Sequence, residues 1–142
     1  MAEGYQIVSM DKPDDAAWEA VGGGISAYNK QQAGPEGGKP VCFVLRAPGG
    51  EIAGGLIGDT YWGWLYVNLL WVKEELRGQG YGRQLLAQAE EEARRRGATH
   101  AYLDTFSFQA PGFYQKQGYQ VFGELPDFPR GHTRYFLTKE LE

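Results

Sequence analysis

A glycine-rich turn between two arginines carries the clearest chemical signal in this chain. Arg77, Gly78, Gly80, Gly82 and Arg83 stand directly before and at the start of an amphipathic segment. Glycine lets the backbone approach a bound anion closely, and a helix N-terminus presents unpaired N–H groups at the positive end of the helix dipole. These residues therefore predict a phosphate-binding turn that is built mainly from backbone N–H groups.

The spacing of these glycines excludes two common nucleotide loops. No G-x-x-x-x-G-K-[ST] string exists in the chain, so a Walker loop is absent. The dinucleotide fingerprint G-x-G-x-x-G, started at Gly78, would need glycine where Arg83 stands. The pattern that remains is R-x-x-G-x-G, from Arg77 to Gly82.

The elements on either side would position this turn. The apolar run 64–72 is typical of a buried strand, and 81–96 is the strongest helix in the chain, ended by Gly97. Its apolar residues Leu85, Leu86, Ala89 and Ala93 share one face. On the solvated face we expect three i,i+4 ion pairs: Glu90 with Arg94, Glu91 with Arg95 and Glu92 with Arg96.

The rest of the chain reads as one α+β domain over residues 1–142. Gly22–Gly24 should break one helical stretch into two, and Pro48-Gly-Gly is a hairpin signal. Consecutive hairpins predict mostly antiparallel pairing, with one parallel pair around the long helix. The expected strands are 5–10, 41–46, 51–57, 64–72, 98–106, 119–124 and 134–141, and the expected helices are 14–21, 25–32, 81–96 and 109–117.

Composition bounds the partners. The net charge is −4, which argues against nucleic acid or an anionic membrane as the principal partner. No signal peptide and no apolar stretch of membrane-spanning length is visible, so we expect a cytoplasmic protein. The single Cys42 permits no intramolecular disulfide and is expected to be a small buried strand residue. Two histidines without clustered ligands predict no metal site.

A second motif follows the strand expected at 98–106. The segment from Ala110 to Tyr119 holds Tyr114 and Gly118 in the pattern A-x-x-x-Y-x-x-x-G-Y. Together the two motifs resemble those of the GNAT acetyltransferases, whose second signature ends in Phe where this chain has Tyr119. The resemblance covers roughly residues 64–141, and the chain is similar to small, bacterial, single-domain members.

The resemblance implies a fold, a cofactor and an acid. The fold would be α/β/α layered, with a mixed, mostly antiparallel sheet whose strands four and five, here 64–72 and 98–106, splay apart. Acetyl-CoA would be the co-substrate, without a metal, and Tyr114 would protonate the leaving thiolate, as suits a phenol with a pKa of ~10. The implied cofactor-binding residues are Leu70, Trp71, Val72, Arg77, Gly78, Gln79, Gly80, Tyr81, Gly82, Arg83 and Ser107.

The general base is left open. Many members of the family carry a carboxylate on strand four, but residues 64–72 contain none. The acceptor ammonium must still lose a proton before it attacks. Asp104 is the first candidate, with Asp59 and a water held by Asn68 or Tyr66 as alternatives.

The acceptor site is expected to be aromatic. Cation–π contacts would suit a small cationic amine or an amine-bearing drug. Protein lysine or N-terminal amines are the next alternative, and a non-catalytic acyl-CoA sensor is another. A homodimer is possible. The residues expected to line the acceptor site include Tyr28, Trp62, Trp64, Asn68 and His132.

Overall fold

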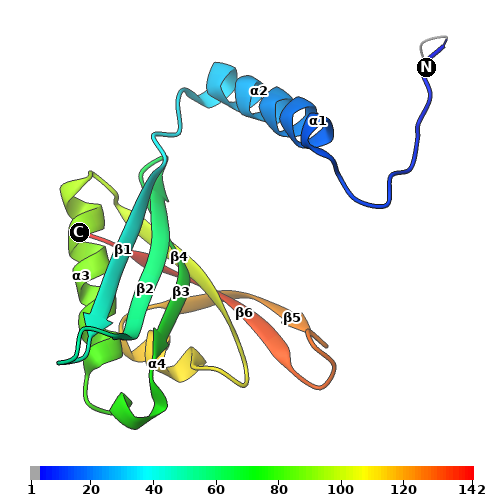
Figure 1. The fold of residues 1–142 in the computed structure, drawn as a ribbon. Coiled ribbons are helices and arrows are strands. Elements are labelled where there is room, and N and C mark those ends of the chain that lie inside the picture. Colours follow the sequence, from blue (N-terminus) through cyan, green and yellow to red (C-terminus); the bar gives the residue numbers. More distant parts are fainter. Residues whose placement is uncertain (1–3) are drawn as a thin grey trace. The chain divides into compact units, whose positions relative to one another are not determined.

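The computed structural model describes residues 4–142 and divides the chain into two compact units, Met1–Glu36 and Gly37–Glu142 (Figure 1). The expectation that residues 1–142 form one domain stays a prediction.

The first unit holds one continuous helical stretch. It runs through α1 (Asp15–Ala17), a π-helical turn η1 (Trp18–Gly22) and α2 (Gly23–Ala33). Asp14 begins it, because its side chain accepts a hydrogen bond from the backbone N–H of Ala17 at 2.8 Å. The predicted break at Gly22–Gly24 is wrong. Gly22 and Gly23 adopt right-handed helical dihedrals, and the π-helical turn carries the hydrogen bonding through them.

The strand predicted at residues 5–10 is also wrong, because these residues form no strand. Four of the six side chains, Tyr5, Ile7, Val8 and Met10, are apolar, and this composition is locally typical of a strand. A strand nevertheless exists only through hydrogen bonds to a neighbour, which no local pattern specifies.

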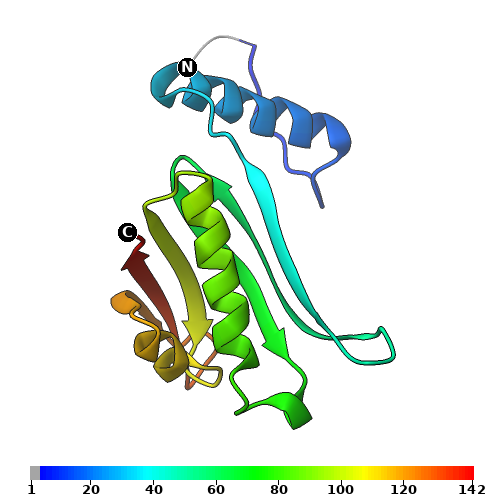
Figure 2. The same cartoon turned by 90° about the vertical axis from the view of Figure 1, so that its left-hand side faces the viewer.

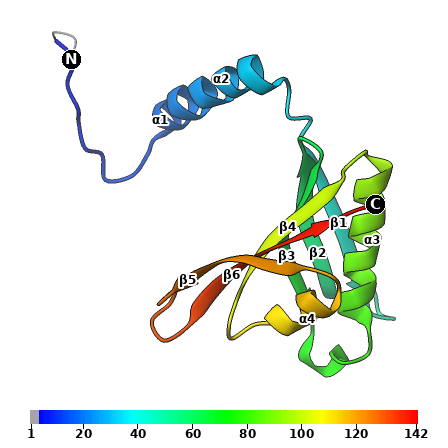
Figure 3. The ribbon, with the colours of Figure 1, turned by 180° about the vertical axis from the view of Figure 1, so that it is seen from behind.

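The second unit is built on a six-stranded sheet in the order β1-β2-β3-β4-β6-β5. Every neighbouring pair except β3 and β4 is antiparallel, so the mixed, mostly antiparallel sheet is confirmed. Figure 3 shows the β5–β6 hairpin curling away from the first three strands. The strands are β1 (Lys39–Arg46), β2 (Ile52–Tyr61), β3 (Trp64–Val72), β4 (His100–Phe106), β5 (Gln120–Pro126) and β6 (Thr133–Glu140).

The splay of predicted strands four and five, now β3 and β4, is confirmed by their pairing. The parallel ladder joins Trp64–Val67 to His100–Leu103 and stops there. Both strands continue beyond it, to Val72 and Phe106. On their β4 side, the backbone groups of Asn68–Val72 therefore have no partner in β4. The two strands leave a gap in the sheet there.

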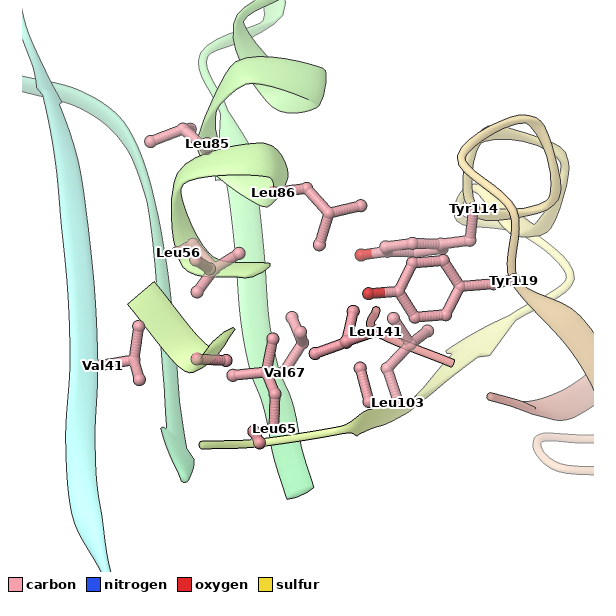
Figure 4. Packing of buried hydrophobic residues seen from close by; sticks show 14 of the residues in the cluster. Val41, Leu56, Leu65, Val67, Leu85, Leu86, Leu103, Tyr114, Tyr119 and Leu141 are labelled. Carbon is pink, nitrogen blue, oxygen red and sulfur yellow. The ribbon is translucent and has the colours of Figure 1, made fainter. Parts of the chain in front are cut away.

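One face of this sheet is covered by α3 (Tyr81–Arg95), and the short α4 (Pro111–Lys116) lies beside its end (Figure 2). Between α3 and the sheet, Leu56, Leu65, Leu103 and Leu137 are fully buried, each contributing about 2 kcal/mol by leaving water. Figure 4 shows Leu86 of α3 facing the rings of Tyr114 and Tyr119 across this core.

Two expectations about single residues are wrong. Glu90 does not pair with Arg94 on the solvated face. It is 5% exposed and binds Lys139 and Tyr119, because its position between Ala89 and Ala93 turns it toward the sheet. Cys42 is exposed rather than buried, because strand alternation gives the core position to its neighbour Val41.

Candidate active site

A cavity of about 440 Å³ opens between the end of β3, the start of α3 and the helix α4. It joins the two sequence motifs in one site. Nine of the predicted site residues line it: Leu70, Val72, Arg77, Gly78, Gly80, Tyr81, Gly82, Arg83 and Tyr114. Four further residues complete the lining: Leu76, Ala110, Phe113 and Gln117.

The floor of this cavity is backbone. Gly80 is the N-cap of α3, has a φ of +88° and offers no side chain that could cap the helix. The first helical hydrogen bond there runs from the N–H of Gln84 to the carbonyl of Gly80 at 3.0 Å. The N–H groups of Tyr81, Gly82 and Arg83 are therefore free of helical partners, and they form a cradle for an anion.

The two arginines of the turn have different surroundings. Arg77 donates from Nε to the carbonyl of Val72 at 2.9 Å and so ties the turn to the end of β3. Arg83 is exposed and lines the cavity. The cradle therefore has one cation that fixes its shape and another that can reach a phosphate.

Tyr114 is the buried titratable group of the cavity, with an exposed fraction of 8%. Burial first, and then the negative charge of Asp104, raises the pKa of Tyr114 to about 12. Its backbone carbonyl accepts a hydrogen bond from the N–H of Tyr119 at 3.0 Å, and the two rings meet edge to face at 5.9 Å. The phenol is thus held rigidly and stays protonated at neutral pH.

Behind Tyr114 lies a small buried polar cluster. The Tyr119 hydroxyl donates to Oε2 of Glu90 at 2.8 Å, and Lys139 donates to Oε1 at 2.9 Å. Burial and the charge of Glu90 raise the pKa of Tyr119. These bonds link α3 to Tyr119, the residue before β5, and to β6.

The face of the sheet opposite α3 has another character. Side chains alternate along β3 and β4, so Tyr66 and Tyr102 point away from the core that buries Leu65 and Leu103. Their rings stack at 4.8 Å, and the hydroxyl groups of Tyr61 and Tyr102 are hydrogen-bonded. Burial, chiefly, raises the pKa values of Tyr66 and Tyr102.

An ion pair lies on this tyrosine face at the mouth of the splay. Arg134 of β6 donates from Nε to Oδ1 of Asp104 at 2.9 Å, and its Nη2 lies 2.9 Å from the same oxygen. The guanidinium carbon stands between 5.0 and 5.3 Å from three ring centroids: those of Phe106, Phe128 and Phe136. Cation–π contacts of this kind restrict where the guanidinium can move.

Several predicted site residues lie elsewhere. Trp71 is 53% exposed and does not line the cavity, because it alternates with Leu70 and Val72. Gln79 donates to the carbonyl of Glu75 at 3.3 Å. Ser107 accepts from the N–H of Thr133 at 3.0 Å and so ties the residue after β4 to the start of β6.

Two of the predicted acceptor residues contact the tyrosine face, because Trp64 meets Tyr102 edge to face at 6.0 Å and Asn68 bonds Tyr66. Trp64 stacks on His100 at 4.6 Å, whereas Asn68 accepts from the Tyr66 hydroxyl at 3.4 Å. His132 lies 3.4 Å from Ser107 Oγ, and Trp62 occupies the β2–β3 turn. Tyr28 belongs to the first unit, on α2.

Sequence reasoning missed residues of two kinds. Ala110, Phe113 and Gln117 line the cavity, and helical spacing around Tyr114 could have found them. Arg134 had no local signal, because it reaches Asp104 only through the β4–β6 pairing.

Two absences hold for residues 4–142, the part of the chain that the structure describes. No group of three or more His, Cys, Asp or Glu in this part of the chain could hold a metal ion. Likewise, none of the helices described there is long and apolar enough to cross a membrane.

Known proteins match this chain over most of its length. The model of the Acetyltransferase (GNAT) family matches residues 7–119. A blasticidin-S acetyltransferase of Streptomyces morookaense is 50% identical over 93 residues, which are 65% of this chain and 68% of that protein. Acetyltransferase Atu2258 of Agrobacterium fabrum is 39% identical over 133 residues, covering 94% of this chain and 97% of the relative.

A solved structure agrees with these sequence relatives. The crystal structure of an acetyltransferase from Bacillus cereus is 34% identical with a TM-score of 0.87, over 94% of this chain and 98% of the other. Acetyl-CoA is accordingly the co-substrate, and the cavity with its backbone cradle fits it. The chain belongs to the GNAT family of acetyltransferases.

Proposed function

We propose that this enzyme transfers the acetyl group of acetyl-CoA to the primary amine of a small molecule by direct attack. The amine nitrogen forms a bond to the acetyl carbon as the carbon–sulfur bond breaks. The amine loses one proton and the sulfur gains one, so the products are an N-acetyl amine and free coenzyme A. The observation that carries the proposal is the single cavity that unites the backbone cradle with Tyr114.

The cradle supports binding of the cofactor's phosphates. The N–H groups of Tyr81, Gly82 and Arg83 would hold the pyrophosphate, helped by the positive end of the α3 dipole. Arg83 would add a charge-assisted contact to a phosphate. Leu70 and Val72 line the part of the cavity beside the splay, where the open strand edge supplies backbone partners for the rest of the cofactor.

Tyr114 acts as the proton donor to the leaving sulfur. Its pKa of about 12 lies above the ~8.5 of an ordinary thiol. The phenol is therefore fully protonated at neutral pH, but it is a weaker acid than the thiol that forms. It consequently donates a hydrogen bond that strengthens as negative charge accumulates on the sulfur, whereas complete transfer of its proton is uphill by the difference between the two pKa values.

Asp104 is the base that we propose for the acceptor ammonium, directly or through a water. It follows Leu103, the last β4 residue paired with β3, and points to the tyrosine face. Its charge contributes to the raised pKa of Tyr114, so the two groups lie within electrostatic reach. Its ion pair with Arg134 holds the carboxylate in place beside the splay.

The tyrosine face supports an acceptor that is small and carries a cation. Tyr66 and Tyr102 present stacked rings beside Asp104, which suits a planar or cationic group. The relative from Streptomyces morookaense is named for blasticidin-S. That antibiotic is therefore the first acceptor to test.

The test is release of coenzyme A thiol from acetyl-CoA, measured with the wild type and Tyr114→Phe. The acceptor panel contains blasticidin S, a small diamine, free lysine and a peptide with a free N-terminal amine. We expect amine-dependent release with a small-molecule acceptor, and a fall of at least about 10-fold in kcat for the variant. The acetyl-CoA affinity should stay within about 3-fold, since the lost hydroxyl matters mainly in the transition state.

Tyr135→Phe is the matched control, because Tyr135 packs against the same core but does not line the cavity. It should leave release unchanged. Release that is equal in Tyr114→Phe and wild type would remove Tyr114 from the mechanism. Acetylation of the peptide alone would favour a protein substrate, and tight acetyl-CoA binding without any release would favour a sensor.

A further inference from the structure

The ion pair of Asp104 and Arg134 engages only one of the two carboxylate oxygens. Both nitrogen contacts of Arg134, from Nε and Nη2, fall on the same carboxylate oxygen, Oδ1, at 2.9 Å each. Among residues 4–142, Oδ2 of Asp104 and Nη1 of Arg134 make no hydrogen bond. An acceptor oxygen and a donor nitrogen therefore stand unused on neighbouring groups, although each side chain can make more bonds.

These atoms are partly withdrawn from water. The side chain of Asp104 is 19% exposed and that of Arg134 is 28% exposed. The three phenylalanine rings around the guanidinium restrict it further. Polar atoms in such a place gain more from a ligand than fully solvated atoms do, because less water remains to compete.

The pair also stands where an acceptor must arrive. Asp104 is the first residue of β4 beyond the ladder with β3. It therefore borders the gap that connects the two faces of the sheet. Its charge reaches both Tyr114, in the cofactor cavity, and Tyr66, on the tyrosine face. The charge of Arg134 reaches Tyr66 as well.

A carboxylate that is already paired binds a simple cation weakly, because Arg134 offsets most of the negative charge of Asp104. A molecule with an ammonium and a carboxylate a few bonds apart avoids this charge offset, because it can bind both members of the pair. Its ammonium can donate to Oδ2 of Asp104 while its carboxylate accepts from Nη1 of Arg134, and each contact is charge-assisted.

We propose that Asp104 and Arg134 together select acceptors whose reacting amine lies beside a carboxylate, as in an α-amino acid. This inference rests on the proposed acetyl transfer and narrows its acceptor class. Asp104 then holds the ammonium that must lose its proton, and Arg134 is a specificity-determining residue that fixes the acceptor's orientation.

The experiment compares acceptors that carry a carboxylate beside the amine with partners that lack this charge. Phenylalanine, phenylalaninamide and phenethylamine form one series, and lysine with 1,5-diaminopentane forms another. The readout is the ratio of kcat/KM between the acid and its partner lacking the charge. We expect a wild-type preference for the acid of about 10- to 100-fold, because a charge-assisted hydrogen bond contributes about 1.5–3 kcal/mol and each 1.4 kcal/mol is tenfold.

Arg134→Gln should bring this ratio to within about 2-fold of one, and Arg134→Lys should keep part of the preference as a point charge. Arg130→Gln, an exposed arginine of the β5–β6 loop, should leave the ratio unchanged. Because the ratio is taken within one variant, partial unfolding lowers both rates and cancels.

Three results would overturn the inference. Equal rates with phenylalanine and phenethylamine in the wild type would overturn it while leaving the proposed acetyl transfer intact. A preference for the acid that survives in Arg134→Gln would assign the carboxylate to another cation. Failure to acetylate any member of either series or of the wider amine panel would remove the proposed function and this inference together.

Discussion

Two ion pairs lie on opposite faces of the same sheet, and they differ in how completely their atoms are used. On the α3 face, both carboxylate oxygens of Glu90 have partners, the Tyr119 hydroxyl at 2.8 Å and Lys139 at 2.9 Å. On the tyrosine face, both contacts of Arg134 fall on one oxygen of Asp104. Glu90 is 5% exposed as a residue, whereas the side chain of Asp104 is 19% exposed.

From this difference we infer that the pair of Glu90 and Lys139 is structural, whereas the pair of Asp104 and Arg134 binds a ligand. In the cluster around Glu90 each carboxylate oxygen already has a partner, and the two bonds join α3 to Tyr119 and to β6. Removing one partner of such a pair leaves a buried charge uncompensated, which costs stability. The pair of Asp104 and Arg134 keeps one donor nitrogen and one acceptor oxygen for a ligand. Substitution of either residue should therefore change acceptor selectivity more than stability.

The largest effect is expected from Glu90→Gln. The substitution removes the charge that offsets Lys139, so the free energy of unfolding should fall by about 2–3 kcal/mol, below the full buried-pair range because Lys139 can reach water. Urea denaturation measures this loss. Glu91→Gln is the matched control on the exposed side of the same helix and should change stability by less than about 0.5 kcal/mol.

The comparison would fail if Glu90→Gln left the unfolding free energy unchanged but altered the preference between phenylalanine and phenethylamine. Such a result would transfer the role of acceptor selection to the α3 face.

An intermediate effect is expected from Gly80→Ala in the backbone cradle. Gly80 has a φ of +88°, and an L side chain in that region costs about 1–2 kcal/mol. If the turn shifts to relieve the strain, its N–H groups lose their alignment, and the dissociation constant for acetyl-CoA should rise about 10-fold. Isothermal titration calorimetry measures that constant.

Gly63→Ala separates strain from binding. Gly63 has a similar φ of +76° but does not line the cavity. It should lose comparable stability while its acetyl-CoA affinity stays at the wild-type value. Equal loss of affinity in the two variants would show that general destabilisation, rather than the cradle, weakens binding.

The smallest effect is expected in the pH profile. A folded-state pKa of about 12 for Tyr114 means that activity should rise with pH as the acceptor amine deprotonates and should not fall below about pH 11. The same shift stabilises the fold fully below the unfolded pKa of about 10, and this contribution is lost as pH rises through the folded value.

Profiles of kcat/KM for wild type and Tyr114→Phe should therefore have one shape at different heights. A falling limb between pH 8 and 10 that appears only in the wild type would contradict a buried, protonated phenol.

Local rules predicted the parts of the fold that local contacts decide. The Pro48-Gly-Gly hairpin turn and the end of α3 at Gly97 follow from short-range geometry, and the structure has both. The same kind of rule failed at residues 5–10, where it predicted a strand, and at Gly22–Gly24, where it predicted a helix break. A strand depends on a distant partner, and a glycine within a helix only weakens it by about 1 kcal/mol.

Glu90 shows the same limit at a single residue. Spacing along α3 allowed it to pair with Arg94 in water, but the helix is turned so that Glu90 faces Lys139 of β6, 49 residues further along the chain. No pattern within α3 specifies that partner.

The sequence by itself determined the family and the helix starts that carry the glycine turn and Tyr114, because these depend on glycine spacing and helix signals that are local to the chain. Only the tertiary structure decided which residues meet on the face that we propose for the acceptor. Asp104 and Arg134 meet because β4 pairs with β6, and Tyr66 and Tyr102 meet because β3 and β4 run in parallel before they part. Long-range strand pairing sets those neighbours, and a single strand carries no record of its partner.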